Sequence, residues 1–532
     1  MQQRFLNRPL LAILIIGLLG GLAERPAYAD SVVVGTGTPA SCTETDLDAG
    51  LAVLFPGSSA PGGTLSFDCG PSPHTIVLTS QKFLHDGAVI DGGDLVTLSG
   101  AHSTRIFWIS QQARVTIQHI TLTRGFAEGG GAIFVEPNWS GTYTSLTVDD
   151  VQFTNNTSSS FGGAIGAQHT NLLITNSVFR DNSAAQTGGA ISFNDGALTL
   201  RASVVGDNEA ISEGGGLEVW SANPLTIEQS SIYSNQLKGT GSFVAGGGML
   251  IYDSTGSIHN TSVSYNRARQ GGGMHIMAGS TLEISASQIS ANLAYVAGAG
   301  IYSASGADLT LREVTLYGNL SYYDGGAIVN SGVLLLQRSL LKSNYGSSGD
   351  GGGLLNYGVA EISNSTVSAN NAVNGAGIMS VAASTTKVQS STIVANSAAE
   401  KGGGIYTKSS SVTILNSIIS ANEALLDGNN CWFDGVSVTI GFSMWSDGSC
   451  GSQTVNGNQP LTFPTLHPLG MNGGTTESYL PRSDSTAIDA GSCLAGSVDQ
   501  RGMPRLVGAA CDIGSVETGT LWARVFIPTL TR

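Results

Sequence analysis

A repeated asparagine constrains the fold of this chain more than any other feature. In the stretch TGGAISFNDGALTLRASVVGDNEA, from Thr187 to Ala210, a Gly-Gly-Ala-Ile step precedes an alternating apolar run and then an asparagine. Equivalent asparagines occur eleven times, mostly 25 to 27 residues apart and once 31 residues apart. They are Asn156, Asn182, Asn208, Asn235, Asn266, Asn292, Asn319, Asn344, Asn370, Asn396 and Asn422. A fixed period of this length indicates a repeat architecture.

Each repeat has the two-residue periodicity of β-strands. The residues three and eight positions before each asparagine are always apolar, as Phe179 and Ile174 are before Asn182. Within ALTLRAS, Leu198 and Leu200 alternate with polar residues, which is typical of a half-buried strand. The Gly-Gly steps suit the corners between strands, because glycine adopts left-handed backbone conformations at little cost.

These patterns predict an all-β fold, a right-handed single-stranded parallel β-helix of the pectate-lyase-like solenoid type. Stacked coils would place equivalent residues about 4.8 Å apart, so that aliphatic side chains fill a continuous core. Stacking would also let neighbouring asparagine amides bond to one another along the axis. We therefore predict that the eleven asparagines form a structural ladder rather than a set of ligand contacts.

Both ends of the repeat region carry different sequence. Thr43 and Asp46 have capping-box spacing and precede a short run of leucines on one helical face, which predicts a helix covering the first coil. We expect an N-terminal cap at 30–74, the repeats at 75–425 and a disulfide-stapled C-terminal segment at 426–517. A short tail follows at 518–532.

The N-terminus has the pattern of a secretory signal peptide at 1–29. Arg4 and Arg8 precede an apolar run from Leu10 to Ala23, and Ala27-Tyr28-Ala29 fits a cleavage site. We expect no transmembrane helix in the mature chain. Export makes the six cysteines candidates for disulfides, and short loops close at the lowest entropic cost. The predicted pairs are Cys42–Cys69, Cys431–Cys450 and Cys493–Cys511.

Composition limits the partners that the protein can have. Charged residues make up only 11% of the chain, and the formal net charge is −15. Nucleic acid is not expected as a partner, because its phosphates require clustered lysine and arginine. We expect a monomer without a cofactor that binds a polysaccharide or another cell-surface component. Ca²⁺ binding is left open as an alternative.

Two groups of motifs resemble known exported proteins. The pair GGAI and FRDN resembles the repeats of polymorphic outer-membrane proteins. The C-terminal part is similar to the choice-of-anchor Q domain of exported bacterial proteins. Its matching stretches are SDGSC at 446–450, NGGTTESYL at 472–480, AIDAG at 487–491, DQRGMPR at 499–505 and CDIGSVE at 511–517. The resemblance implies a secreted or surface-displayed bacterial β-helix, and it implies no particular reaction.

The sequence favours a non-catalytic adhesin or an extracellular matrix or glycan-binding module. Asp149 and Asp150 are the only adjacent acidic pair in the repeats, and the companion motifs of pectin hydrolases are absent, so we place the pair at a solvated turn. A polysaccharide lyase or glycoside hydrolase acting on an acidic polysaccharide is the main alternative. A purely structural envelope component is the third.

Two enlarged coils are candidate binding positions. From Ile133 to Ile165 and from Leu217 to Met249 the spacing is 32 residues instead of about 26. Loops on a rigid scaffold often carry binding residues, although surface loops also tolerate insertions without a function. Whether the long coils near 134–164 and 218–248 form a binding site is left open. The candidate ligand contacts are Trp139, Tyr143 and Trp220.

Two charged groups have alternative interpretations. Arg267 and Arg269 form either a small cationic spot or a solvated turn, and we favour the turn. A denser set near the C-terminus is interpreted as buried ion pairs that lock the terminal segment onto the last coil, with a Ca²⁺ or ligand site as the alternative. Its members are Asp489, Asp499, Arg501, Arg505, Asp512 and Glu517.

Overall fold

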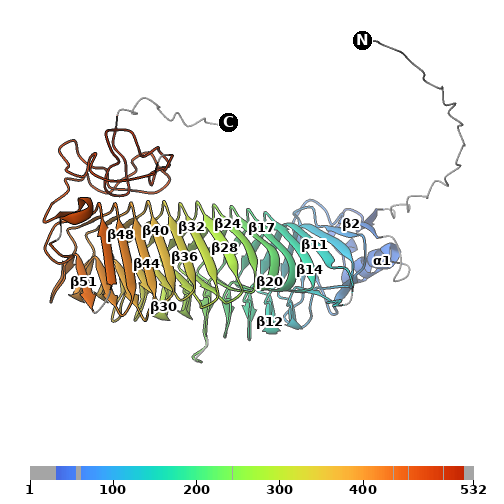
Figure 1. The fold of residues 1–532 in the computed structure, drawn as a ribbon. Coiled ribbons are helices and arrows are strands. Elements are labelled where there is room, and N and C mark those ends of the chain that lie inside the picture. The colour runs from blue at the N-terminus through green and yellow to red at the C-terminus, as the bar shows by residue number, and fades with distance from the viewer. Residues whose placement is uncertain are drawn as a thin grey trace, which may run out of the picture.

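A computed structural model of the chain shows one long solenoid with a helix at one end and a loop-rich lobe on its flank (Figure 1). The structure describes residues 31–55, 62–139, 141–241, 244–434, 437–452, 454–494 and 496–519. The signal peptide predicted at 1–29 and residues 520–532 of the predicted tail lie outside these ranges. Among the described residues, no helix combines the length and the apolar character that a membrane crossing would need.

The helix α1 (Glu44–Leu54) covers the N-terminal end of the solenoid. Thr43 and Asp46 form a capping box, in which the Asp46 N–H donates to Thr43 Oγ1 and the Thr43 N–H donates to Asp46 Oδ2. The apolar face of α1, including Leu47, Leu51 and Leu54, is buried in the core. The open end of the first coil is thereby shielded from pairing with other strands.

A representative coil contains the strands β17 (Ile191–Arg201), β18 (Val204–Gly206) and β19 (Glu209–Ala210). Each strand pairs in parallel with its counterpart one coil further on, so that β17 pairs with β20 (Leu217–Glu228) and β18 with β21 (Ser231–Tyr233). Within the described residues, this pairing joins 42 strands, from β1 (Val32–Val34) to β54 (Gln459–Pro460), in one continuous sheet. The prediction of an all-β parallel solenoid is confirmed, and its strands lie on both sides of the expected range 75–425.

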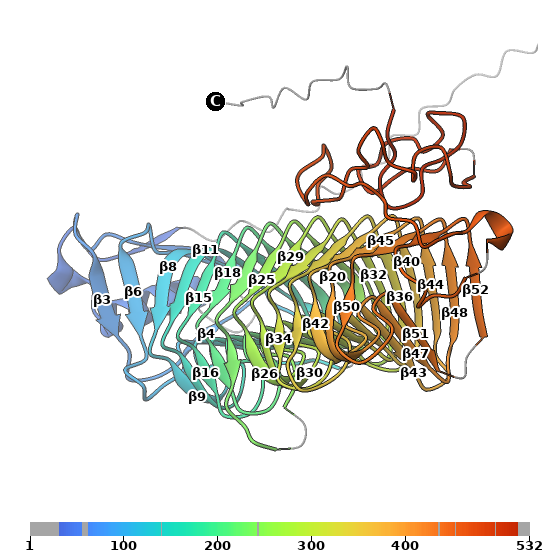
Figure 2. The same cartoon turned by 90° about the vertical axis from the view of Figure 1, so that its left-hand side faces the viewer.

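A second sheet runs along one edge of the solenoid and is built from the last short strand of each coil (Figure 2). Its 12 strands are β9 (Phe126–Gly129), β12 (Thr157–Phe161), β16 (Ser183–Ala184), β19 (Glu209–Ala210), β22 (Gln236–Leu237), β26 (Arg267–Gln270), β30 (Leu293–Ala297), β34 (Leu320–Ser321), β38 (Tyr345–Gly346), β42 (Asn371–Asn374), β46 (Ser397–Lys401) and β50 (Glu423–Ala424). Because these strands stack in sequence order, residues about 26 positions apart become neighbours on its surface.

The asparagine column lies inside the fold, at the corner before the second sheet. Asn182 Nδ2 donates to Asn208 Oδ1 at 3.0 Å and to the carbonyl of Phe153 at 3.0 Å, and the Asn182 N–H also donates to Asn208 Oδ1. The same contacts recur from coil to coil, and all eleven asparagines are buried. At the end of the column Asn422 Nδ2 donates to Asn430 Oδ1.

The Gly-Gly step forms a tight corner that excludes side chains. Gly188 has a φ of 64°, and a Cβ atom at this position would lie 2.5 Å from the carbonyl oxygen of Ile191. A second left-handed corner, at which residues with side chains stand, lies between β17 and β18 and at the equivalent places of the neighbouring coils, at Asn176, Ala202 and Gln229, with φ values of 51°, 47° and 51°. The crowding explains why the first corner is held by glycine while the second tolerates varied residues.

The segment 462–519, here called the C-terminal lobe, folds back along the solenoid flank (Figures 1 and 2). It lies against coils that precede it by more than a hundred residues in the sequence. Thr366 Oγ1 donates to Gln500 Oε1 at 2.7 Å, and Ser368 and Tyr479 share a hydroxyl hydrogen bond of 2.8 Å. The lobe is therefore docked on β41 (Thr366–Ser368), which belongs to the same column of strands as β18.

Candidate ligand-binding groove

Two of the predicted ligand contacts, both in the first enlarged coil, pack on a histidine of the next coil. The rings of Trp139 and Tyr143 lie 5.5 and 4.0 Å from the ring of His169, between centroids. The Tyr143 hydroxyl donates to Asp195 Oδ1, and Asp195 Oδ2 lies 2.7 Å from His169 Nδ1. These contacts fix the loop against the next two coils, and the role of the two rings in ligand binding stays a prediction.

The third predicted contact, Trp220, lies in β20 and is half-buried. Its ring packs on Tyr252, one coil further on, at 4.5 Å between centroids. No ring contact joins it to Trp139 or Tyr143 in the described part of the chain. The structure therefore does not assemble the three predicted aromatic residues into one site.

The second enlarged coil borders a groove of about 840 Å³ on the second sheet. We call this the cationic groove. Its lining residues are Gln236, Leu237, Lys238, Gly239, Thr240, Arg267, Arg269, Tyr295, Val296, Tyr322, Tyr323 and Ser348. Three basic residues and three tyrosines thus meet on one face of a chain whose net charge is −15.

The strand register explains how these residues come together. Arg267 in β26 pairs with Leu293 in β30, and Leu293 pairs with Leu320 in β34. Two residues beyond each of these positions, Arg269, Tyr295 and Tyr322 follow one another along the solenoid. Residues 238–240 of the second enlarged coil form one wall of the cationic groove.

The groove is held by contacts between its own basic and aromatic side chains. The guanidinium carbon of Arg267 lies 4.8 Å from the centre of the Tyr295 ring, and Tyr295 stacks on Tyr322 at 5.6 Å with an interplanar angle of 20°. Lys238 forms an ion pair with Glu209. Tyr322 and Tyr323 are 45% and 57% exposed, so their rings are available to a ligand.

Sequence reasoning identified part of this groove and missed the rest. It favoured a solvated turn for Arg267 and Arg269, which the structure instead places in the strand β26. It considered the enlarged coil separately and did not connect either feature to Tyr295, Tyr322 and Tyr323. The signal was present, because Arg269, Tyr295 and Tyr322 are separated by 26 and 27 residues, which is the repeat period. Following an outward-facing column, as was done for the buried asparagines, would have found the tyrosines.

A larger groove of about 1120 Å³ lies where the C-terminal lobe meets the solenoid flank. Its floor consists mainly of small polar side chains such as Ser203, Ser230 and Ser287. Its charged residues already have partners, since Lys342 pairs with Glu477 and Glu313 pairs with Arg338. This groove offers space but little chemistry that would select a ligand.

The acidic pair in the repeats has the environment of a surface corner. Asp149 Oδ1 accepts hydrogen bonds from Thr175 Oγ1 at 2.6 Å and from Asn176 Nδ2 at 2.9 Å. These bonds lower the pKa of Asp149, so its carboxylate stays ionised near neutral pH. Asp150 is exposed and adopts a φ of 52° at the left-handed corner. A general acid would need the opposite shift in pKa.

Glu218 and Glu213 are among the carboxylates whose pKa values are raised. Burial raises the pKa of Glu218, whose Oε2 accepts hydrogen bonds from Ser192 Oγ and Thr187 Oγ1. Burial, followed by the charge of Glu218, also raises the pKa of Glu213. Glu218 is only 9% exposed, so its carboxylate has little access to a polymeric substrate.

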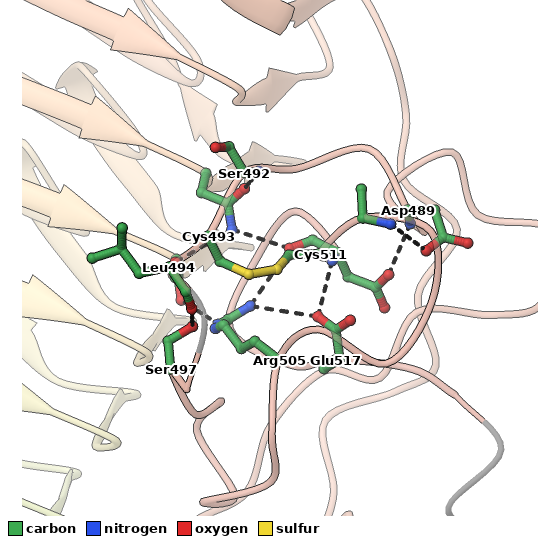
Figure 3. Close-up of a disulfide and its surroundings, with 12 residues drawn as sticks. Asp489, Ser492, Cys493, Leu494, Ser497, Arg505, Cys511 and Glu517 are labelled. Carbon is green, nitrogen blue, oxygen red and sulfur yellow. Dashed lines mark hydrogen bonds and ion pairs between the residues drawn. A yellow bond between two sulfur atoms is a disulfide. The ribbon is translucent and has the colours of Figure 1, made fainter.

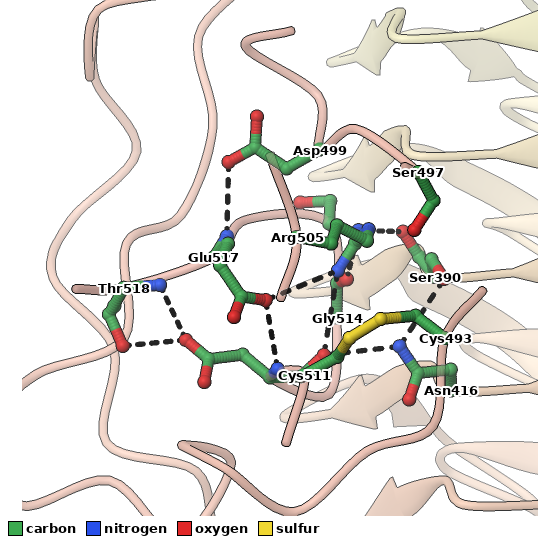
Figure 4. Close-up of polar contacts among 12 residues, drawn as sticks. Ser390, Asn416, Cys493, Ser497, Asp499, Arg505, Cys511, Gly514, Glu517 and Thr518 are labelled. Carbon is green, nitrogen blue, oxygen red and sulfur yellow. Dashed lines mark hydrogen bonds and ion pairs between the residues drawn. A yellow bond between two sulfur atoms is a disulfide. The ribbon is translucent and has the colours of Figure 1, made fainter. Parts of the chain in front are cut away.

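The predicted terminal charge set converges within the C-terminal lobe (Figure 4). Arg505 is 1% exposed and donates to Asn364 Oδ1 and to the carbonyl oxygen of Ser390, both on the solenoid. It also donates to the carbonyl of Gly514 at 2.8 Å. Arg505 therefore connects the lobe to two coils through neutral acceptors.

The remaining members of this set bind one another and the lobe backbone. Arg501 pairs with Asp499 at 2.7 Å and donates to the carbonyl of Glu517. Asp512 Oδ1 accepts the Asp489 N–H at 2.9 Å. Glu517 Oε2 lies 3.9 Å from Arg505 Nη1, and burial raises the pKa of Glu517 to about 7. Within the described residues, no group of three His, Cys, Asp or Glu side chains is placed to hold a metal ion.

The six cysteines are joined in sequential pairs. Cys42–Cys69 connects the α1 region to the first coil, and Cys431–Cys450 lies at the last coil. Cys493–Cys511 lies beside Arg505 in the C-terminal lobe (Figure 3). Two of the links thus lie at the ends of the solenoid, where fewer coils are available to stabilise the chain by stacking, and the third closes a loop of the lobe on its flank.

Residues 131–319 and 299–459 match the family described as the right handed beta helix region. The chain belongs to this family. No curated protein matches the chain. Among solved structures, the chain is similar to the crystal structure of PfbA, a surface adhesin of Streptococcus pneumoniae. The sequence identity is 11% and the TM-score is 0.35, and the match covers 85% of this chain and 99% of the PfbA chain. A likeness at this level does not bear on function, so the function of this β-helix protein is argued from its groove.

Proposed function

We propose that this β-helix protein is an exported, secreted or surface-displayed module that binds a polysaccharide through the cationic groove without cleaving it. The observation that carries the proposal is the meeting of three basic residues and three tyrosines beside an enlarged coil. Aromatic faces pack well against the apolar faces of sugar rings, and the tyrosine hydroxyls can bond to sugar hydroxyls. A rigid solenoid holds such a surface with little loss of entropy on binding.

Export is supported by the covalent chemistry of the chain. Three disulfides suit an oxidising compartment outside the cytosol. The signal-peptide pattern at 1–29 and the resemblance to choice-of-anchor Q and polymorphic outer-membrane proteins favour the same location. The repetitive flank and the length of the solenoid suit an adhesin or a matrix module, which we propose as the role.

A binding role is favoured over hydrolysis by the residues that line the groove. Hydrolysis of a glycosidic bond requires a pair of carboxyl groups flanking the bond. The described lining of the cationic groove contains no Asp, Glu or His residue. A lyase is the second candidate function, because lysine, arginine and tyrosine side chains can assist proton abstraction, and Lys238, Arg267 and Tyr322 all line the groove.

The proposal is tested by a glycan-binding screen run in parallel with a polysaccharide-degradation screen. The double variant Tyr322→Ser/Tyr323→Ser should lose binding of the recognised glycan. Tyr265→Ser is the matched control, since Tyr265 is 68% exposed and does not line the groove. Unchanged binding by the double variant would contradict the proposal, and turnover of any polymer would favour the lyase.

The same screen tests the contacts predicted from the sequence. A variant carrying Trp139→Ala and Tyr143→Ala removes the aromatic residues of the first enlarged coil, and Trp220→Ala removes the third. If the cationic groove is the binding site, all three changes should leave affinity within about twofold of the wild type. Loss of binding in these variants alone would move the site to the first enlarged coil.

A further inference from the structure

Resting on the function proposed above, we infer that the cationic groove selects an anionic glycan laid parallel to the solenoid axis. The ligand class is a polymer with carboxylate or sulfate groups on its sugar rings. The inference goes beyond glycan binding, because a neutral polymer could use the tyrosines alone. It depends on three features of the groove: two arginines without an acidic partner, the order of the side chains along the axis, and the fixed position of Arg267.

The first feature is two arginines without an acidic partner. Within the described residues, neither Arg267 nor Arg269 forms an ion pair, although both are exposed at the groove. Two arginines on other faces do form ion pairs, since Arg201 pairs with Glu228 and Arg312 pairs with Glu283. Guanidinium groups bind carboxylate and sulfate oxygens through parallel N–H donors, which makes them selective for such groups.

The second feature is the order of side chains along the solenoid. Lys238, Arg269, Tyr295 and Tyr322 each lie two residues beyond a column of paired residues in four successive coils, Gln236, Arg267, Leu293 and Leu320, and the register shifts by one residue between Ala268 and Gln270. Neighbouring strands lie about 4.8 Å apart. Two basic positions are therefore followed by two aromatic positions over roughly 15 Å. A chain running along the axis would place charged groups at one end and stacked rings at the other.

The third feature is that the groove is formed before a ligand arrives. The guanidinium of Arg267 rests on the Tyr295 ring, and Tyr295 in turn stacks on Tyr322. An arginine already held on an aromatic face loses less side-chain freedom when it binds an anion. The separation between the charged and aromatic ends also predicts that oligosaccharides bind more tightly than single acidic sugars.

The test compares polymers that share a backbone and differ in charge. Wild-type protein is titrated with polygalacturonate and with the same polymer after full methyl esterification, and in parallel with dextran sulfate and dextran. We expect measurable binding to at least one charged polymer, at least about tenfold weaker binding to its neutral counterpart, and weakening of the charged interaction as salt is raised. The two pairs of polymers separate carboxylate recognition from sulfate recognition.

Two variants locate the interaction on the groove. Arg267→Gln/Arg269→Gln should weaken binding to the charged polymer by at least about tenfold. Arg201→Gln/Arg312→Gln removes the same formal charge from other faces, and its affinity should stay within about twofold of the wild type. Equal weakening in both variants would show that only net charge matters, which would contradict a charge-selective groove.

Each remaining outcome separates this inference from the proposed function. Equal binding of charged and neutral polymers, lost in Tyr322→Ser/Tyr323→Ser, would leave the proposed function standing and overturn the charge selectivity. Absence of binding to all four polymers and across the glycan screen would overturn both. Binding of duplex DNA as tight as that of the charged glycans would show an unselective cationic patch and would also overturn the inference.

Discussion

Replacing one asparagine in the middle of the buried column tests whether the repeat is built on an internal ladder. Asn292 Oδ1 accepts the N–H of Asn266 at 3.0 Å and the side-chain Nδ2 of Asn266 at 3.1 Å. Asn292 Nδ2 donates to Asn319 Oδ1 and to the carbonyl of Val263, each at 3.0 Å. Asn292→Leu keeps the approximate volume and removes all four of these hydrogen bonds.

The cost follows from the groups that lose their partners. Both Asn266 and Asn319 are fully buried, so water cannot replace the lost contacts without opening the fold. The Asn266 N–H loses its acceptor entirely, whereas Asn266 Nδ2 keeps the carbonyl of Ile232. Asn319 Oδ1 keeps the backbone N–H of residue 292, so the Asn266 N–H is the one group that loses its acceptor. An unsatisfied buried group costs about 1–3 kcal/mol, and a loss of about 1–3 kcal/mol is therefore predicted.

The assay is thermal unfolding combined with hydrogen exchange, because long repeat arrays need not unfold in a single step. We expect a melting temperature lowered by several degrees and faster amide exchange in the coils that contain Asn266, Asn292 and Asn319. Asn371→Leu is the matched control, since Asn371 is the next residue after a ladder asparagine but is exposed. Equal melting temperatures and equal exchange for the two variants would refute the ladder.

Three further predictions concern the lobe and the corners. Burial raises the pKa of Glu517 to about 7, above its unfolded value near 4.5. Its contribution to lobe stability should therefore be present below pH 4.5 and lost as the pH rises through 7. Glu517→Gln should flatten this pH dependence in protease-protection assays that are corrected for the activity of the protease. Arg505→Leu removes the charge that faces Glu517 and Asp499, and it should destabilise lobe docking by about 3–5 kcal/mol. We expect faster proteolysis of residues 487–519 and an unchanged circular dichroism spectrum of the solenoid. Equal protection of the variant and the wild type would contradict the anchoring role of Arg505. Gly188→Ala should lower the melting temperature, because Gly188 has a φ of 64° and an added Cβ atom would crowd Ile191. Gly241→Ala is the control and should leave the melting temperature unchanged, because a Cβ atom there would meet nothing within 4 Å. Equal melting temperatures for the two variants would refute this explanation of the corner.

The fold was predictable from the sequence because stacking turns sequence period into spatial columns. Residues such as Phe179 and Val205 recur at a fixed distance before each asparagine, and the structure places them in register in β15 (Val178–Arg180) and β18. The capping box at Thr43 was equally local and therefore visible. Structural features that involve one coil or its immediate neighbours could therefore be predicted from the repeat pattern of the sequence.

The site was harder to predict for two physical reasons. The tyrosines of the cationic groove face outward, where no core imposes one residue type on a column, so the column that holds Tyr295 and Tyr322 also holds Arg269. The docking of the C-terminal lobe joins Arg505 to Asn364, 141 residues apart, and no repeat relates these two positions. Composition indicated that both arginines and acids near the C-terminus would pair, but it did not indicate which coils they would contact.

The central claim, that the cationic groove binds a polysaccharide without cleaving it, is tested most directly by mapping protection in the presence of polygalacturonate. Hydroxyl-radical footprinting reports on tyrosine rings, and gel filtration of the same sample reports the length of the polymer. The account predicts protection of Tyr295, Tyr322 and Tyr323 with the polymer length unchanged. Protection confined to Trp139 and Tyr143, or a progressive shortening of the polymer, would contradict it.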